Sequence, residues 1–216
     1  MTDSAVLKSG VTLAVIAALC TAMVALTYRF TEQRIAANEQ AWLERSLQPA
    51  LSGLFYDSGV TESQLIVPPP HELPGSEAAI VYRVYAEGAP VAALFVVSAR
   101  DGYAGPIRLL IGIEVGGVVT GVHVLDHSET PGLGDRVETS KSDWAQQFNG
   151  HSLTNPDPAG WRIKRDGGQF DQLTGASVTP RAIIKATRDT LLYFSTHSDP
   201  IFAEVVAETD EGEQAQ

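Results

Sequence analysis

The longest apolar stretch of the chain lies near its amino terminus. No charged residue occurs from Ser9 to Tyr28. A helix of that length is about 30 Å long, which matches the thickness of the hydrocarbon core of a bilayer. Lys8 precedes the stretch, as in a cleaved signal peptide, but no A-x-A pattern follows it. The pattern therefore predicts an uncleaved transmembrane helix at 9–28, preceded by a short segment at 1–8.

The residues that follow this stretch have the spacing of an amphipathic helix. Ile35, Trp42 and Leu43 recur among charged residues, which is typical of a helix with one apolar face. A proline-rich stretch then begins at Val67 and reads as a surface turn region. We expect a helical arm and linker at 29–75.

Four short apolar runs separated by glycine-containing turns come next. They are rich in Val, Ile, Leu and Tyr, which favour strands. The predicted strands are Ala78–Glu87, Pro90–Ala99, Pro106–Val115 and Gly117–Asp126. Gly116 and Gly117 between two such runs are typical of a tight hairpin. The runs therefore predict an antiparallel meander.

The remainder of the chain mixes element types. The pattern predicts a short helix at Ser142–Phe148, a strand at Trp161–Arg165, a helix from Arg181 to about Thr196 and a short strand at Pro200–Ala207. Strands followed by helices indicate the α+β class, with a single transmembrane helix followed by a twisted antiparallel sheet covered by helices. We place this soluble domain at 76–207 and expect a disordered acidic tail at 208–216.

The last long helix has a clear start and a clear inner face. Thr179 is the expected N-cap and Pro180 the first helical residue. One face of this helix is formed by Ile183, Ile184, Thr187, Leu191 and Phe194. That spacing predicts core packing against the sheet.

The composition of the chain excludes several classes of function. The formal net charge of −11 argues against nucleic-acid binding, which normally needs a basic surface. The single cysteine, Cys20, lies in the apolar stretch, so an intrachain disulfide or a cysteine-ligated iron–sulfur cluster is excluded. Redox chemistry would therefore need an organic cofactor. His123 and His127 are four residues apart at the end of a strand, where that spacing does not form one face, so we expect no metal site. For His127, a surface loop position is the expectation.

The loop before the last helix carries the strongest chemical signal. Gly175 and Ala176 allow the backbone to approach a ligand closely, and Ser177 adds a hydroxyl. The unpaired amides and the dipole of the following helix favour an anionic group. These features predict a phosphate site.

The stretch Asp171-x-x-Thr174-Gly175-Ala176-Ser177 resembles the flavinylation motif of the FMN-binding domain family. In that family the last hydroxyl residue, usually Thr, carries FMN through a phosphoester bond. The matching residue here is Ser177. The resemblance implies one covalently bound FMN and a separate flavin transferase that moves FMN from FAD onto the protein.

A second stretch, from His127 to Asp135, is similar to the loop that meets the flavin in G subunits of Rnf-type electron transport complexes. The run from Gly102 to Glu114 and the single anchor are also similar to those of these G subunits, so the resemblance spans nearly the whole chain. The implied flavin-site residues are Ser177 as covalent acceptor, Asp171, Thr174, Gly175, Ala176 and Thr179 in the acceptor loop, and Glu129, Thr130, Gly132, Leu133 and Gly134 in the second loop. The resemblance implies an electron carrier and not an enzyme by itself, with no catalytic residue.

The resemblance also implies a place for the protein in the cell. It implies a single-pass protein of the bacterial inner membrane, in contact with lipid and with other membrane subunits of the complex. Arg29, Arg34 and Arg45 would by the positive-inside rule place the domain in the cytoplasm, whereas the resemblance implies the periplasmic side, which we follow. Two alternatives stay open: a C subunit of a sodium-translocating NADH:quinone oxidoreductase, and an unflavinylated, membrane-tethered assembly or binding module.

Overall fold

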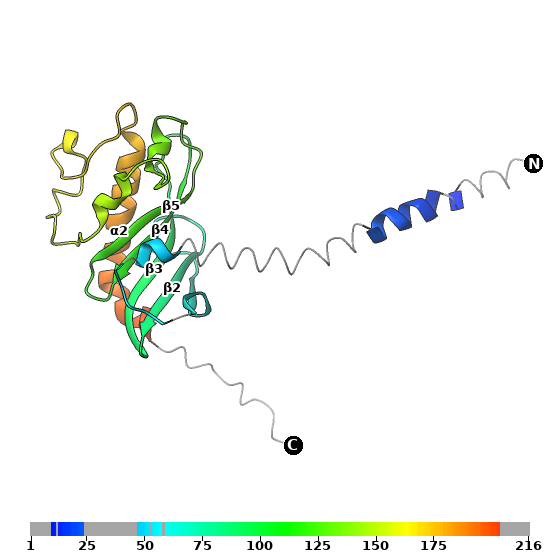
Figure 1. Ribbon diagram of the computed structural model, residues 1–216, viewed down its shortest axis with the longest axis horizontal. Coiled ribbons are helices and arrows are strands. Elements are labelled where there is room, and N and C mark those ends of the chain that lie inside the picture. Colours follow the sequence, from blue (N-terminus) through cyan, green and yellow to red (C-terminus); the bar gives the residue numbers. More distant parts are fainter. Residues whose placement is uncertain (1–9, 12, 24–46, 52, 58, 204–216) are drawn as a thin grey trace, which may run out of the picture. The chain divides into compact units, whose positions relative to one another are not determined.

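The computed structural model describes residues 10–11, 13–23, 47–51, 53–57 and 59–203 (Figure 1). The chain divides into two units, residues 1–45 and residues 46–216, and each unit is described by itself.

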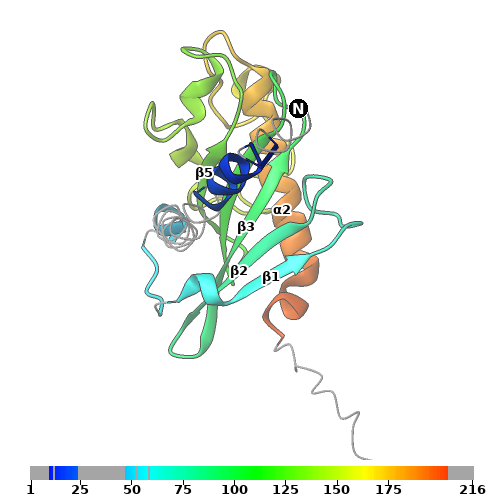
Figure 2. The ribbon, with the colours of Figure 1, turned by 90° about the vertical axis from the view of Figure 1, so that its right-hand side faces the viewer.

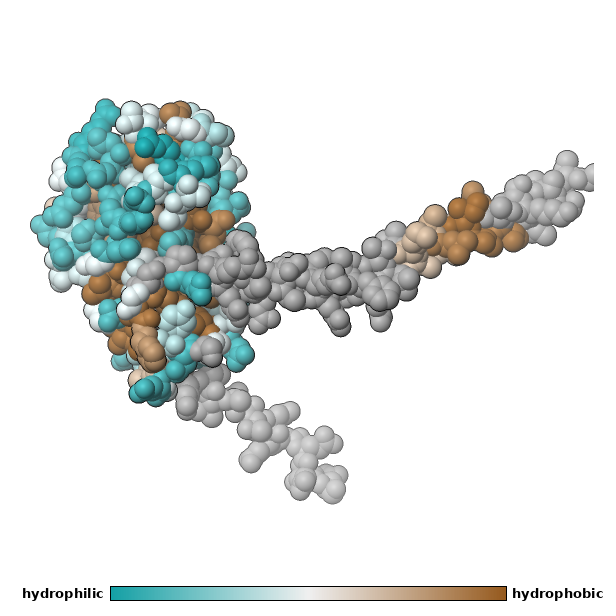
Figure 3. Space-filling view, in the orientation of Figure 1, coloured by the Kyte–Doolittle hydropathy of each residue, from teal (hydrophilic) through white to brown (hydrophobic). Residues whose placement is uncertain are grey.

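The described residues of the first unit form helix, and their apolar side chains are exposed (Figure 3). Among the described residues, none of the helices is long and apolar enough to cross a membrane. The helix predicted at 9–28 extends beyond the described residues at both ends. The segment 1–8, the predicted arm up to residue 46 and the acidic tail at 208–216 lie outside them.

The second unit is built on a five-stranded antiparallel sheet (Figure 1). Its strands are β1 (Gln64–Val67), β2 (Ala79–Ala86), β3 (Ala89–Ala99), β4 (Ile107–Glu114) and β5 (Val119–Asp126). They lie side by side in chain order, so the predicted meander is confirmed. Strand β1 was not predicted, and it lies within the range expected to be arm and linker. The sheet therefore begins before residue 76.

One face of the sheet is covered by the long helix α2 (Val178–Phe202), as Figure 2 shows. The rings of Tyr193 and Phe194 meet Phe95 of β3 edge to face, with centroids 6.4 and 6.1 Å apart. The residues predicted for the inner face of this helix are all buried. Edge-to-face contacts between buried rings add to the stability that burial itself gives.

The opposite face is covered in part by the 3₁₀ helix η1 (Gln48–Leu51). The Thr120 hydroxyl donates a hydrogen bond to the Ala50 carbonyl. A Cβ at Gly112 would lie 2.6 Å from that carbonyl oxygen, so the approach of η1 to the sheet requires glycine there. Residues that precede β1 in the chain therefore pack against the face of the sheet opposite α2.

The structure contradicts one predicted strand and the described part of another. The segment predicted as a strand at Trp161–Arg165 forms only an isolated bridge, Ile163 to Phe170, followed by the 3₁₀ helix η5 (Lys164–Asp166). The chain folds back there so tightly that a Cβ at Gly168 would lie 2.0 Å from the Arg162 carbonyl oxygen.

Pro200, Ile201 and Phe202 of the strand predicted at Pro200–Ala207 belong to the end of α2, and Ala203 is its C-cap. Ile201 is buried there, and Phe202 meets Tyr85 and Phe194 edge to face. Packing against the sheet thus overrides the β propensity of these residues. The short helix predicted at Ser142–Phe148 is the 3₁₀ helix η4 (Trp144–Phe148).

Candidate functional site

A cleft of about 400 Å³ lies at the amino-terminal end of α2. Three segments far apart in the chain form its walls: the loop before β4, the loop after β5, and the loop that leads into α2. The lining residues are Tyr103, Glu129, Thr130, Leu133, Gly134, Gly175, Ala176, Ser177, Val178 and Thr179. The structure thus brings most of the residues that the two motifs singled out to one cleft, and their contact with a flavin stays a prediction.

Three of the predicted site residues do not line this cleft. Gly132 lies in the turn of the second loop, with φ +79°. Thr174 is exposed in the turn before Gly175. Asp171 has a side chain 64% exposed, and its carboxylate lies 2.6 Å from the ammonium of Lys164. None of these three residues therefore forms part of the cleft wall.

The helix start differs from the prediction in one respect. The N-cap of α2 is Ser177, with φ −101° and ψ −18°, and its side chain makes no capping hydrogen bond. The predicted N-cap, Thr179, lies inside the first turn. Its hydroxyl donates a hydrogen bond to the buried carboxylate of Glu129 and therefore does not cap the helix. The Ser177 hydroxyl is left at the helix end, beside backbone amides that have no partner within the helix.

Glu129 connects the three walls of the cleft. Although it is a carboxylate, the residue is only 4% exposed. Besides the Thr179 hydroxyl, the backbone N–H of Ala104 donates to it at 3.0 Å. A Cβ at Gly134 would lie 2.8 Å from Glu129 Oε2, and one at Gly102 would lie 3.0 Å from Oε1. Both glycines therefore make room for this carboxylate, and its hydrogen bonds satisfy it in the interior.

Gly175 brings the acceptor loop against the second loop. Its φ of +82° lies in the left-handed region that favours glycine. A Cβ there would also lie 2.9 Å from Leu133 Cδ2. The backbone conformation thus favours glycine at this position, and a Cβ there would force the exposed Leu133 side chain to shift.

His127 stabilises the second loop, which follows β5, through two hydrogen-bond contacts. Its Nδ1 accepts a hydrogen bond from the Glu129 backbone N–H at 3.0 Å, and its Nε2 lies 3.0 Å from Glu138 Oε1. These partners fit an imidazole that carries its proton on Nε2. The expectation of a surface loop position is wrong, because the side chain of His127 is 10% exposed.

Asp135 fixes the other end of this loop. The Gly132 backbone amide and the Lys141 ammonium hold the pKa of the Asp135 carboxyl below its usual range. Lys141 lies 2.9 Å from Asp135 and 2.5 Å from Glu138. The residues behind the cleft are therefore tied into one network of ion pairs and hydrogen bonds.

Tyr103 and Val178 also line the cleft, although the sequence pattern did not single them out. Tyr103 is 71% exposed and Val178 is 39% exposed. The only sequence signal for Tyr103 is its position in the glycine-containing stretch that begins at Gly102. That stretch carried a family resemblance and was not predicted to form part of a site.

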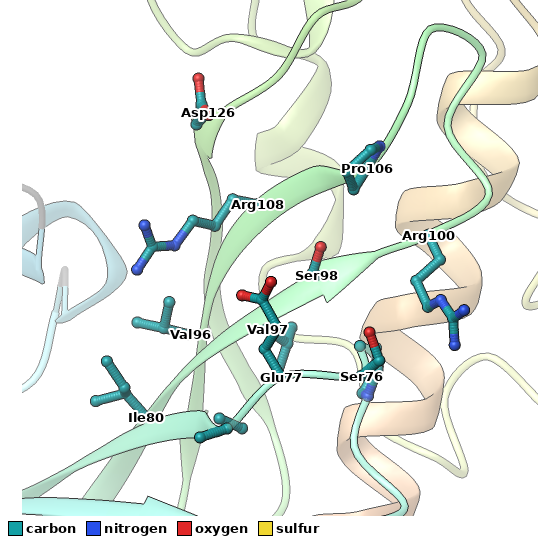
Figure 4. A pocket seen from close by; sticks show the side chains of 14 residues that line it. Ser76, Glu77, Ile80, Val96, Val97, Ser98, Arg100, Pro106, Arg108 and Asp126 are labelled. Atoms are coloured by element: carbon teal, nitrogen blue, oxygen red, sulfur yellow. The ribbon is translucent and has the colours of Figure 1, made fainter. Parts of the chain in front are cut away.

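A second cleft, of about 450 Å³, lies elsewhere on the sheet (Figure 4). Figure 4 shows Arg108, Ser98, Glu77, Val96 and Ile80 among the side chains that line it. None of the residues predicted for the flavin site lines this cleft. It therefore contains neither the start of α2 nor Ser177.

The three cleft walls and the first part of α2 lie in a region that matches a known domain. Residues 102–192 match the FMN-binding domain family, so the second unit contains an FMN-binding domain. Residues 1–49 match the RnfG N-terminal region. The chain belongs to the family of G subunits of ion-translocating oxidoreductase complexes.

Full-length relatives support this assignment. The chain is 37% identical over 196 residues to the G subunit of the ion-translocating oxidoreductase complex of Pseudoalteromonas atlantica, covering 91% of each chain. The G subunit of Shewanella oneidensis is 38% identical over 202 residues, covering 94% of this chain and 95% of the relative. That of Pseudomonas aeruginosa is 39% identical over 204 residues, covering 94% of each.

A solved structure is also similar in part. The C subunit of the Na⁺-translocating NADH-quinone reductase from Parabacteroides distasonis superposes with a TM-score of 0.44 at 17% identity. The match covers 59% of this chain and 65% of the other.

Proposed function

We propose that this protein is a membrane-anchored electron-carrier subunit of an Rnf-type ion-translocating oxidoreductase complex, with FMN attached to Ser177 through a phosphoester bond. One observation carries the proposal. Ser177 is the N-cap residue of α2 and lines the cleft, yet its hydroxyl makes no capping hydrogen bond. Because this hydroxyl does not cap the helix, it is available for attachment of the FMN phosphate.

The cleft residues fit both ends of FMN. The amides and dipole at the start of α2 stabilise a phosphate beside Ser177. Leu133, Val178 and Tyr103 offer apolar surface for the ring system. The cleft volume lies within the range of about 300–1,000 Å³ that is usual for small-molecule sites. When bound, FMN supplies one- and two-electron transfer chemistry, and the protein's part is to orient it and to limit its contact with water.

Attachment requires a flavin transferase. The Ser177 oxygen forms a bond to the FMN phosphorus of FAD, its proton is released, and AMP leaves. Asp171 and Thr174 are exposed beside the acceptor and do not line the cleft, so they are placed for recognition by the transferase. A covalent bond also prevents loss of the cofactor from a domain outside the cytoplasm.

The remaining parts of the proposal rest on the family. We place the anchor at 9–28 in the inner membrane, the domain on the periplasmic side, and other membrane subunits of the complex as its electron-transfer partners. Full-length similarity to G subunits favours this function over a C subunit of the sodium-translocating NADH:quinone oxidoreductase. The other alternative is an assembly module without flavin, which does not need the Ser177 hydroxyl.

The proposal is tested by intact-mass spectrometry of the denatured full-length protein after coexpression with a flavin transferase. The wild type and Ser177→Thr should gain the mass of FMN less one water, and Ser177→Ala should not. Ser195→Ala is the matched control, since it removes an exposed serine hydroxyl of α2 outside the cleft and should keep the adduct. An adduct that persists in Ser177→Ala would overturn the assignment of the acceptor. No adduct in any variant, with the transferase active on another substrate, would support the assembly module.

A further inference from the structure

The apolar side chains around the acceptor are unusually exposed. Tyr103 is 71% exposed, Leu133 is 42% exposed and Val178 is 39% exposed, and all three line the cleft that contains Ser177. Large apolar side chains gain little stability when they remain in water, so these three add little to the core. Apolar surface gathered around a cleft marks a binding site.

Tyr103 is carried by a tightly held loop. The backbone N–H of Ala104, the next residue, donates to the buried carboxylate of Glu129 at 3.0 Å. A Cβ at Gly102, the preceding residue, would lie 2.2 Å from the Gly105 carbonyl oxygen and 2.9 Å from Ile107 Cγ1. The backbone on both sides of Tyr103 is thus fixed while its ring remains in solvent. A ring held out by a fixed loop loses little entropy on binding, which favours contact with a ligand.

The cleft has a polar part and an apolar part. The helix end and Ser177 form the polar part, and Tyr103, Leu133 and Val178 form the apolar part. FMN has the same division, with a phosphate at one end and a flat aromatic ring system at the other. Once the phosphate is fixed at Ser177, the ring system meets the exposed apolar side chains.

We propose that Tyr103 packs its phenol ring against the isoalloxazine ring of FMN and is a binding residue for it. This inference rests on the proposed function, because it requires FMN on Ser177. Among the three exposed apolar residues of the cleft, Tyr103 alone is aromatic, and aromatic rings attract one another in offset or edge-to-face contact. Leu133 and Val178 then supply the aliphatic part of the same surface.

The contact between Tyr103 and the flavin can be detected optically, without a measurement of electron-transfer activity. A phenol ring in contact with an oxidised flavin quenches its fluorescence, because the phenol donates an electron to the excited flavin. Neither a benzene ring nor an aliphatic side chain donates readily. A benzene ring does keep the stacking, which perturbs the visible circular dichroism of the flavin.

The test uses the full-length flavinylated protein in detergent, with loading measured by intact mass for each variant. Flavin fluorescence per bound FMN should rise several-fold in both Tyr103→Phe and Tyr103→Leu. The visible circular dichroism should stay close to wild type in Tyr103→Phe and change in Tyr103→Leu. Tyr85→Phe is the matched control, since Tyr85 meets Phe202 at the other end of α2 and its loss should leave fluorescence unchanged.

The outcomes separate the two proposals. Full FMN loading with unchanged fluorescence per flavin in both Tyr103 variants would overturn the contact and leave the acceptor assignment intact. Absence of FMN from the wild type would overturn the proposed function and the contact with it. If Tyr103→Leu loads poorly, Tyr103→Phe decides, because it removes only one hydroxyl group.

Discussion

The hydroxyl of Thr179, in the first turn of α2, donates a hydrogen bond to the buried carboxylate of Glu129, fifty residues earlier in the chain. Thr179 is fully buried, and Glu129 is nearly so. This bond joins α2, whose N-cap is the proposed acceptor Ser177, to the loop after β5. The geometry of the cleft therefore depends on a polar contact between two of its walls.

Replacing Thr179 by Val should destabilise the protein, because it leaves the buried Glu129 carboxylate short of one donor. We expect the free energy of unfolding to fall by about 1–3 kcal/mol, the usual cost of an unsatisfied buried polar group. Thr179→Ser should retain most of the stability. Urea unfolding of the full-length protein measures both. Thr187→Val is the control, since the Thr187 hydroxyl bonds only the Ile183 carbonyl of its own helix, and it should cost less. Equal stability of Thr179→Val and wild type would contradict the role of this bond.

Gly175→Ala should slow attachment of FMN. Gly175 and Gly167 have nearly the same φ, +82° and +83°, but only at Gly175 would a Cβ meet Leu133. Both substitutions should lower stability by roughly 1 kcal/mol through backbone strain. Only Gly175→Ala should also reduce the rate at which the transferase adds FMN, measured by intact mass against time. A similar rate for both variants would show that the approach of the acceptor loop to Leu133 does not matter for attachment.

Glu129→Gln should raise the reduction potential of bound flavin. The change replaces a buried carboxylate in the cleft wall by a neutral amide of similar shape, and reduction adds negative charge to the flavin. Protein and solvent partly screen the Glu129 charge from the flavin. Removing this charge is expected to raise the reduction potential of the flavin by roughly 20–60 mV. Spectroelectrochemical titration measures the shift. Glu114→Gln removes one exposed carboxylate at the far end of β4 and should leave the potential within a few millivolts, so an equal shift in both variants would rule out a local effect.

Stability should fall as the pH is lowered from 7.5 to 5.5, in part because of His151. Its ring meets Phe170 and Trp161 edge to face, and burial there lowers the pKa of His151. Between the lowered folded-state pKa and the unfolded-state value of about 6.5, the unfolded chain binds more protons, so acid favours unfolding in this window. His151→Phe keeps an aromatic ring and should lose less stability over this range. Unfolding curves at the two pH values compare them, and an identical pH dependence would exclude His151 as a contributor.

Local pattern was enough to predict most of the sheet. Apolar runs rich in Val, Ile, Leu and Tyr, separated by glycine-containing turns, placed β2 to β5 to within two residues at each end. It did not find β1, because Gln64–Val67 is short and its strand character comes from pairing with β2. The contradicted strand and the described part of the other failed for a related reason, since a tight turn at Gly167–Gly168 and packing at the end of α2 decide those segments.

The acceptor loop and the second loop were visible as motifs, but the contacts between them were not. Nothing in the spacing of the chain indicates that Thr179 bonds Glu129 or that Gly175 lies against Leu133. These contacts depend on how the sheet directs two distant loops to one place. Tyr103 was missed because an exposed aromatic residue in a turn carries no local signal until its neighbours in space are known.

The strands lie in the sheet in the same order as in the chain, and this has a consequence for assembly. Short connections join β2 to β5, so each hairpin can close with little loss of chain entropy. The acceptor serine reaches its position only after α2, the last element, has docked across a much longer loop. The complete cleft therefore exists only when α2 is packed against the sheet. A transferase that requires the complete cleft would modify only molecules in which α2 has docked.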